Sequence, residues 1–214
     1  HPDVAATCSA LADVYFYTGE HAKGEPLIRE ALRIRRTLYG EVHPAVAESL
    51  ADLGTNYGNR GDFPQAEVYL REALALQRKL HPTVHPDLAE AMNNLASVLL
   101  DLNQPIQAAP LYRQVLAMDR QLYGAAPPVL ANGLNNLGYV LEIRGNYLGA
   151  ENAYRESLAM KRKLLGDSHP LIADGMSNLG FVLYRKGDRQ GGIELLRDAL
   201  KMRRQELGAE HPDV

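Results

Sequence analysis

Apolar residues recur at steps of three and four along nearly the whole chain, which is the period of a helix with one buried face. Residues 43–60 and 63–80 both follow this period, and Gly61 and Asp62 between them predict a turn. The apolar positions are Val46, Ala47, Leu50, Leu53, Gly54 and Tyr57 in the first segment, and Ala66, Tyr69, Leu70, Ala73, Leu74, Leu76 and Leu80 in the second. The pattern therefore predicts two helices joined by a short turn.

The same helix pair recurs with a fixed period of 42 residues. A His-Pro doublet begins at residues 1, 43, 85, 169 and 211, and Pro127-Pro128 stands where the remaining copy is due. The period predicts five units, at residues 1–42, 43–84, 85–126, 127–168 and 169–210, with residues 211–214 beginning a sixth. One helix pair is too thin to bury its own apolar faces, so the units are expected to stack into an all-α solenoid that forms a single repeat domain over residues 1–214.

Residues at the ends of the predicted helices support this division. The positions that close the first helices carry residue types that adopt a left-handed conformation easily, at Gly19, Gly61, Asn103, Gly145 and Gly187. Mostly good capping residues follow, at Glu20, Asp62, Gln104, Asn146 and Asp188. The second helices are expected to end at Gly40, Gly124, Gly166 and Gly208, with Pro82 as the exception, and Pro26 and Pro110 predict a late start or a slight bend.

Small residues mark the places where the two helices of a unit should approach closely, at Gly24, Ala66, Ala108, Ala150 and Gly192. Larger apolar residues follow four positions later, at Ile28, Leu70, Tyr112, Tyr154 and Leu196. The alternation of small and large residues at these repeat-equivalent positions predicts a closely packed helix pair in each unit.

The segment LNNLGYVLEIRGNYLGAENAYRESLAMKRKLLGDSHP, residues 134–170, and its relatives MNNLASVLLDLNQPIQAAPLYRQVL and MSNLGFVLYRKGD carry a family resemblance. The chain resembles tetratricopeptide-repeat proteins of the 42-residue kinesin-light-chain-like type over its whole length. The resemblance implies a right-handed superhelical solenoid of antiparallel helix pairs, with a concave groove lined by the first helix of each unit. It also implies a non-catalytic scaffold that binds a partner peptide or helix in that groove.

Charge and composition narrow the choice of partner. The net charge of -3 and the pI near 6.2 provide no basic field for phosphates, so neither nucleic acid nor a membrane surface is expected as a partner. No apolar stretch approaches the roughly 18 residues of a membrane span, and no signal-peptide pattern is present. The single cysteine, Cys8, excludes an internal disulfide and a Cys-rich metal site. We expect a cytoplasmic protein that binds another protein or a peptide.

Sequence patterns for catalysis are missing. The chain has no Gly-rich phosphate loop, no nucleophile elbow and no His-Glu-x-x-His motif, so we expect neither an enzyme nor a cofactor. The repeated histidines lie roughly 10 Å apart at helix-packing distances and cannot share a metal ion. His81 and His85 form the densest pair, but no cysteine or third histidine lies nearby, and no metal site is expected.

The resemblance assigns the groove positions residue by residue. It places a row of amides on adjacent first helices, with an acid at the matching place in the second unit: Asn93, Asn94, Asn135, Asn136 and Asn178, with Asp52. Such amides could hold the backbone of an extended peptide, or they could only stabilise contacts between helices. Exposed rings could anchor peptide side chains at Phe16, Tyr17, Tyr139, Phe181 and Tyr184. Further groove positions are acidic and favour a basic or neutral peptide, namely Asp13, Glu48, Glu90, Asp101, Glu142 and Asp174, with Arg185 near one end.

Two columns of arginines run along the second helices, seven residues apart. They contain Arg29, Arg71, Arg113, Arg155 and Arg197, and Arg36, Arg78, Arg120, Arg162 and Arg204. They could bind an acidic partner, or they could form ion pairs on the outer face. The second interpretation is favoured because Glu25, Glu67 and Glu151 precede three of them by four residues.

An alternative function is a structural or regulatory segment of a larger signalling enzyme, for example a kinase, that acts by self-association or by positioning a neighbouring domain. The last helix of the chain is expected to be uncapped and to expose Leu195, Leu196, Ala199, Leu200 and Met202. Such a face could accept a second copy of the chain.

Overall fold

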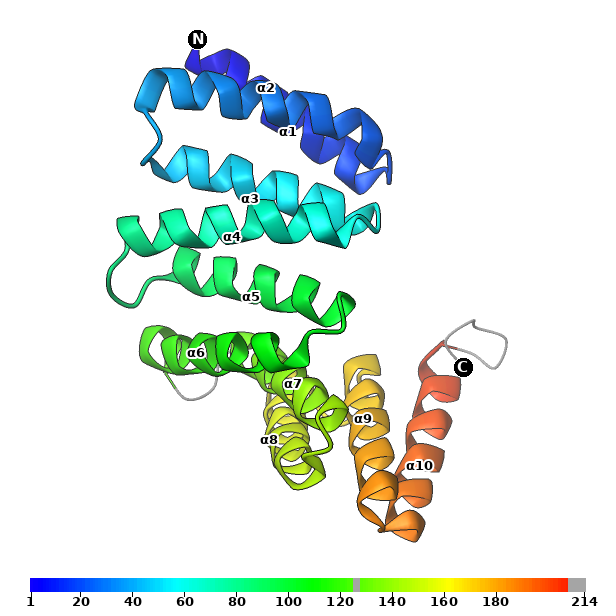
Figure 1. The fold of residues 1–214 in the computed structure, drawn as a ribbon. Helices are drawn as coiled ribbons and strands as arrows, with labels where there is room; N and C mark the ends of the chain where they lie inside the picture. Colours follow the sequence, from blue (N-terminus) through cyan, green and yellow to red (C-terminus); the bar gives the residue numbers. More distant parts are fainter. Residues whose placement is uncertain (125–127, 208–214) are drawn as a thin grey trace. The chain divides into compact units, whose positions relative to one another are not determined.

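The computed structural model describes residues 1–124 and 128–207, which form ten α-helices and no strand (Figure 1). The helices are α1 (Pro2–Tyr17), α2 (His21–Tyr39), α3 (Pro44–Asn59), α4 (Phe63–Leu80), α5 (Pro86–Asp101), α6 (Pro105–Tyr123), α7 (Pro128–Ile143), α8 (Tyr147–Leu165), α9 (Pro170–Lys186) and α10 (Arg189–Leu207). The predicted all-α repeat solenoid is confirmed. The first helices begin at prolines that are 42 residues apart in the sequence.

The chain divides into two compact units, His1–Met118 and Asp119–Val214, and the division falls within α6. In the first unit, helices α1 to α5 each pack against the next, and α3 also contacts α5. In the second unit, α7 to α10 each pack against the next, and α7 also contacts α9. Contacts between successive first helices, such as α3 and α5, are those expected of the inner layer of a curved stack. The inner layer of each unit therefore consists of odd-numbered helices.

The His-Pro doublets start the first helices, as the sequence indicates. His43 and His85 are extended, and the proline after each occupies the first helical position. The sequence did not reveal that the imidazole is itself the cap. Nδ1 of each histidine accepts a hydrogen bond from the backbone N–H two residues later, at 3.2 to 3.3 Å for His1, His43, His85 and His169. Positions 127 and 211–214 lie outside the described residues.

The other predicted helix ends are also largely confirmed. Gly19, Gly61, Asn103, Gly145 and Gly187 all have positive φ angles. Side chains cap the second helices at Asp62, Asn146 and Asp188, whereas Glu20 makes no side-chain cap bond. Gly208 lies outside the described residues.

Of the two alternatives predicted from Pro26 and Pro110, the late helix start was wrong, and the slight bend stays a prediction. Both prolines lie inside their helices, which begin at His21 and Pro105. Proline removes one backbone hydrogen bond from a helix, and this local loss does not stop the helix where tertiary packing holds the turn in place. In α2, Gly24 lies against Ala12 of α1, and Glu25 accepts a hydrogen bond from Tyr57 of α3.

The small residues lie where helices meet, as predicted. Ala66, Ala108 and Ala150 are completely buried. A Cβ atom on Gly24 would lie only 3.2 Å from Nδ2 of Asn56 and 3.5 Å from the backbone oxygen of Ala12. These contacts let large side chains fill the adjacent space, and Leu70, Tyr112 and Tyr154 are almost fully buried. Small residues on one helix thus leave room for large side chains in the space between neighbouring helices.

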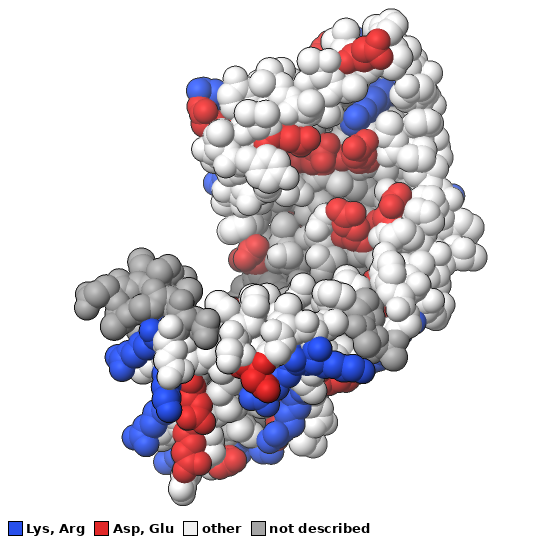
Figure 2. Space-filling view, turned by 180° about the vertical axis from the view of Figure 1, so that it is seen from behind, with Lys and Arg blue, Asp and Glu red and all other residues white. Residues whose placement is uncertain are grey.

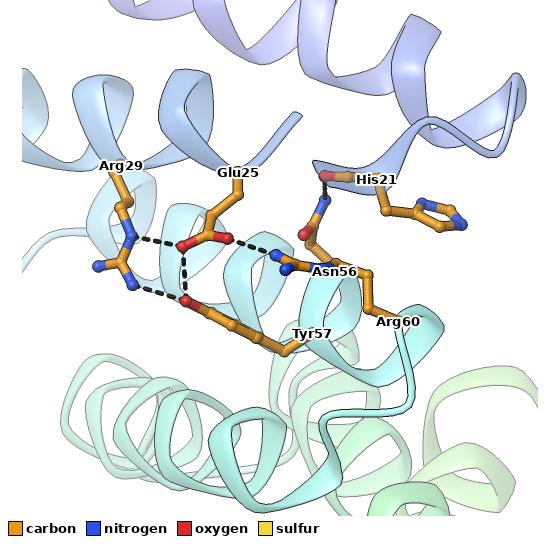
Figure 3. Close-up of polar contacts among 6 residues, drawn as sticks. All are labelled: His21, Glu25, Arg29, Asn56, Tyr57 and Arg60. Atoms are coloured by element: carbon orange, nitrogen blue, oxygen red, sulfur yellow. Dashed lines mark hydrogen bonds and ion pairs between the residues drawn. The ribbon is translucent and has the colours of Figure 1, made fainter. Parts of the chain in front are cut away.

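A polar cluster joins α2 to α3 in the first unit, and its members point toward one another in Figure 3. Oε1 of Glu25 accepts hydrogen bonds from the Tyr57 hydroxyl at 2.6 Å and from Nε of Arg29 at 3.0 Å. Arg60, at the end of α3, donates to the other carboxylate oxygen. Nearby, Nδ2 of Asn56 donates to the backbone oxygen of His21 at 2.9 Å. In the second unit, Glu151 receives the equivalent Arg155 and Lys186, but Leu183 replaces the tyrosine.

Six of the ten column arginines form ion pairs within the described residues, which agrees with the interpretation favoured from the sequence: Arg29, Arg36, Arg71, Arg120, Arg155 and Arg162. Arg29, Arg71 and Arg155 each pair with the glutamate four residues before them, at 2.7 to 3.0 Å. Other bonds join successive second helices and always span 36 residues: Arg36 to Glu72, Arg71 to Gln107 at 2.8 Å, and Arg120 to Glu156 at 3.0 Å. The outer faces of α2, α4, α6 and α8 are thus cross-linked within the described residues.

The expected apolar face on the last helix is only partly present. Ala199 is 1% exposed, and Leu195 and Met202 pack against the core of the second unit. Leu196 lies close to Gly180 of α9. The prediction that Ala199 is exposed was wrong, because its position in the helix points toward α9 rather than away from it. Leu195, Leu196, Leu200 and Met202 are half-buried.

Candidate functional site

The hollow of the first unit is lined by α1, α3 and α5, together with the inward edge of α4. Figure 2 shows acidic side chains gathered over this hollow. The lining acids come from three helices: Asp13 from α1, Glu48 and Asp52 from α3, and Asp87 and Glu90 from α5. Only Glu48 and Glu90 are 42 residues apart and so share one position in the repeat, whereas the equivalent of Asp52 on α5 is Asn94.

The larger cavity in this hollow has a volume of about 580 Å³. Its polar lining includes Asp52 and Asn94, two of the predicted groove residues. Its other lining residues are His43, Pro44, Ala45, Ala47, Glu48, Ala51, Ala73, Gln77, Asp87, Glu90 and Ala91. The small apolar residues leave the space open, and the acids give it a negative lining.

A second cavity of about 410 Å³ lies beside the first and shares Asp52, Glu90 and Asn94 with it. Phe16 and Tyr17 of α1 line this second cavity. Their rings meet edge to face with centroids 5.5 Å apart, and Tyr17 is 85% exposed. The structure thus brings together the predicted residues Asp52, Asn94, Phe16 and Tyr17.

The environment of Asp52 is strongly unfavourable for its charge. Burial raises the pKa of Asp52 to about 7, and the neighbouring carboxylates of Glu48, Asp13 and Glu90 add to the rise. Arg35 opposes it. That arginine is already engaged, with Nη1 at 2.6 Å from the Ser49 hydroxyl and Nη2 at 3.5 Å from Glu48. Asp52 therefore takes up a proton much more readily than an ordinary aspartate.

The sequence reasoning missed a column of polar residues on the inward side of the second helices. Arg35, Gln77, Asp119 and Lys161 are 42 residues apart, and each is at most 9% exposed. Gln77 lines the larger cavity, and its Oε1 atom has no hydrogen-bond partner. The repeat period could have revealed this column, because a polar residue recurs at one place within an otherwise apolar stripe.

The remaining predicted groove residues do not line these two cavities. Asn93 is half-buried on α5, and Asn135, Asn136 and Asn178 are half-buried in the second unit. Nδ2 of Asn178 donates to Oδ1 of Asn135 at 2.9 Å, so this pair ties α7 to α9. That bond supports the alternative in which some of these amides stabilise helix contacts. Exposed rings remain at Tyr139, Phe181 and Tyr184.

The groove acids Glu142 and Asp174 of the second unit each pair with a base, whereas in the part of the first unit that the structure describes only Glu48 does so among the lining acids Asp13, Glu48, Asp52 and Glu90. Glu142 lies 3.7 Å from Arg185 and accepts a hydrogen bond from the Tyr154 hydroxyl at 3.1 Å. Asp174 lies 2.7 Å from Arg203. Among the described residues of the first unit, Asp13, Asp52 and Glu90 form no ion pair of this kind. The acidic character of the predicted groove is thus concentrated in the first unit.

His81, His85 and Asp87 lie close together, with one potential metal-binding atom of each within 4.8 Å of the others. The two imidazole rings are stacked in parallel, with centroids 3.5 Å apart and planes 5° from each other. An imidazole nitrogen binds a metal in the plane of its ring, and parallel stacked planes do not converge on one ion. Nδ1 of His85 also caps α5. This geometry favours a structural stack, and the expected absence of a metal site stays a prediction.

Comparison with known families gives a consistent result. The profile described as "Tetratricopeptide repeat" matches residues 3–79, 59–121 and 129–205, and a second profile with the same description matches residues 93–164. No curated protein sequence matches the chain. None of the described helices combines the length and the apolar character that a membrane crossing requires.

Solved structures share the fold. The kinesin light chain nearly identical TPR-like repeats of Podosopora anserina are 22% identical with a TM-score of 0.86, and the match covers 97% of this chain and 98% of that one. BtubC (BKLC) from P. vanneervenii is 25% identical with a TM-score of 0.84, covering 99% and 84%. MamA from Desulfovibrio magneticus RS-1 is 19% identical with a TM-score of 0.70, covering 95% and 97%. Repeats of this fold generally mediate protein interactions and are generally non-catalytic.

Proposed function

Since the chain belongs to the tetratricopeptide-repeat family, we propose that it is a non-catalytic scaffold that binds a peptide segment of a partner protein in the hollow of its first unit. The observation that carries this proposal is the meeting of Asp52, Asn94, Phe16 and Tyr17 around two adjoining cavities. An amide and exposed rings from different helices supply the two kinds of contact that an extended peptide needs.

Each kind of contact has a physical role. The Asn94 amide can donate and accept at once, so it can hold peptide backbone without selecting a sequence. The ring of Tyr17 offers a large apolar surface and loses few rotamers when a ligand covers it. Because the hollow opens along α1, α3 and α5, a bound segment would cross three helices. Binding should therefore depend on residues that are far apart in the sequence.

Peptides selected from a randomised display library against the protein provide the test. We expect Asn94→Ala and Tyr17→Ala each to weaken binding of the selected peptides about tenfold, as measured by fluorescence anisotropy. Asn152→Ala on α8 and Tyr123→Ala on α6 are matched controls, because both side chains are exposed outside the hollow. Circular dichroism would check that every variant keeps its helical content. Equal affinity for wild type and both hollow variants would refute the proposal.

Self-association is a second candidate function, supported by the surface of α1. Val4, Leu11 and Val14 are all large apolar residues with at least two-fifths of their surface exposed, and their spacing of seven and three places them on one helix face. If a second copy of the chain covered this face, burial of these apolar side chains would stabilise the dimer. We expect sedimentation velocity to show dimers that dissociate in the Leu11→Glu variant. A wild-type monomer at high protein concentration would rule this candidate out.

A further inference from the structure

Resting on the proposed peptide-binding function, we infer that the larger cavity of the first unit takes a lysine or arginine side chain of the bound peptide as its anchor. The cavity would thereby select the partner by charge.

The lining of the cavity accepts hydrogen bonds and carries negative charge. Carboxylates come from Glu48 and Asp52 on α3 and from Asp87 and Glu90 on α5, and no lysine or arginine is among the lining residues. Glu48 shares Arg35 with Ser49. Asp52 and Glu90 have no basic partner within the described part of the first unit. A cationic side chain would supply the charge that these groups lack.

Gln77 provides an independent indication of a donor ligand. Its residue is only 8% exposed, it lines the cavity from α4, and its buried Oε1 atom has no hydrogen-bond partner. An unpaired buried carbonyl is costly, and such groups in folded proteins usually have a partner. An ammonium or guanidinium group has several N–H donors and no acceptor, so it could satisfy Gln77 and the carboxylates together.

The apolar part of the lining suits the stem of such a side chain. Pro44, Ala45, Ala47 and Ala51 from α3, together with Ala73 from α4, form small walls between the acids. Lysine and arginine carry a chain of methylene groups before the charged head, and these groups gain by contact with apolar walls. A sodium or chloride ion in solution could use neither the walls nor the depth of a cavity of about 580 Å³.

Binding of the cation should be linked to a proton. With its pKa near 7, Asp52 is protonated in part, and a bound cation stabilises only its ionised form. The groups that face it are Asp13 on α1, Arg35 on α2, Glu48 on its own helix and Glu90 on α5, while His43 lines the same cavity. Affinity for a cation should therefore fall as the pH drops from 8 to 6. Ionisation of one group with a pKa of about 7 limits this fall to about tenfold.

The experiment uses tetralysine blocked at both ends and the same peptide with all four side chains acetylated. Backbone amide shifts in NMR titrations report both the affinity and the place of binding. We expect tetralysine to bind at least about tenfold more tightly than the acetylated peptide, with the largest shifts around Asp52 and Glu90. We further expect its affinity to fall about tenfold from pH 8 to pH 6, and calorimetry in two buffers to show proton release.

Asp52→Asn should weaken tetralysine binding at pH 8 by about ten- to hundredfold and remove its dependence on pH. Glu30→Gln is the matched control, because it removes one negative charge from α2, where Glu30 pairs with Arg33 outside the cavity. Equal binding of the acetylated peptide, or an equal loss in Glu30→Gln and Asp52→Asn, would overturn the inference. An unchanged pH dependence in Asp52→Asn would do the same.

The two proposals can fail separately. If tetralysine does not bind in the cavity but display-selected peptides still lose affinity in Asn94→Ala, the cationic anchor is wrong and the peptide-binding hollow stands. If neither kind of peptide depends on residues of the hollow, both proposals fall.

Discussion

Gly192→Ala should lower the free energy of unfolding of the second unit by about 1–3 kcal/mol or more. A Cβ atom on this residue would lie 2.6 Å from the backbone oxygen of Gly180 and 2.8 Å from the backbone nitrogen of Tyr184. Neither atom can rotate away as a side chain can, so α10 would have to move away from α9. Chemical denaturation followed by circular dichroism would measure the loss.

This result would be unexpected from the repeat alone. Alanine occupies the equivalent places at 66, 108 and 150 and is completely buried at each, so the repeat indicates alanine at position 192. Gly58→Ala is the matched control. Gly58 lies within α3, and a Cβ atom there would lie 3.7 Å from its nearest neighbour, Cγ2 of Val98. Gly58→Ala should raise stability by about 0.5–1 kcal/mol. A Gly192→Ala protein as stable as wild type would show that α9 and α10 are not held as closely as described.

Glu25→Gln should destabilise the first unit by about 1.5–3 kcal/mol at neutral pH, the range for hydrogen bonds to a charged group. The carboxylate of Glu25 receives the Tyr57 hydroxyl, Arg29 and Arg60 together, and its side chain is 22% exposed. An amide in its place keeps one acceptor but presents an N–H₂ group to donors. Thermal and urea unfolding of the variant would measure the effect.

The same cluster should make the wild-type protein sensitive to acid. The Tyr57 hydroxyl and the two arginines hold the pKa of Glu25 at about 2, against an ordinary value of 4.5. The carboxylate therefore stabilises the fold fully above pH 4.5, and this contribution is lost as the pH falls toward 2. Glu25→Gln should lack this part of the pH dependence. The difference in stability between wild type and Glu25→Gln should thus shrink from pH 5 to pH 2.

Glu30→Gln serves as the control for Glu25→Gln, because Glu30 lies on the same helix and pairs only with the nearby Arg33 on the protein surface. Its loss should change stability little, since exposed ion pairs contribute little. If both variants lost stability equally, the cluster around Glu25 would have no special role.

Local features of this fold could be predicted from the sequence because each depends on residues that are close along the chain. Each of these features depends on residues within about one helical turn of one another. Examples are the helix period, the left-handed helix ends at Gly61 and Asn103, and the ion pair of Arg29 with Glu25. The 42-residue period then allowed the same assignments in every unit. The period does not predict differences between units, such as the closer approach of α9 to α10 at Gly192.

The candidate site could be predicted only in part, because its properties arise between helices. Asp52 and Asn94 were identified by their repeat position, but the raised pKa of Asp52 depends on acids from α1 and α5. Asn178 bonds to Asn135 rather than to Asn136, its repeat equivalent. The inward-facing Gln77 was missed because its column contains four different residue types. The pKa of Asp52, the partner of Asn178 and the burial of Gln77 all depend on how the helices pack against one another.

The outer-face bonds that span 36 residues have a consequence for how such a chain can change its length. Each joins one helix pair only to the next, as in Arg36 to Glu72 and Arg120 to Glu156. Copying or removing a whole 42-residue block would break one junction and create another of the same kind, whereas a shorter insertion would leave donors facing the wrong acceptors. The architecture thus permits the gain or loss of whole 42-residue repeats and disfavours insertions or deletions of part of a repeat.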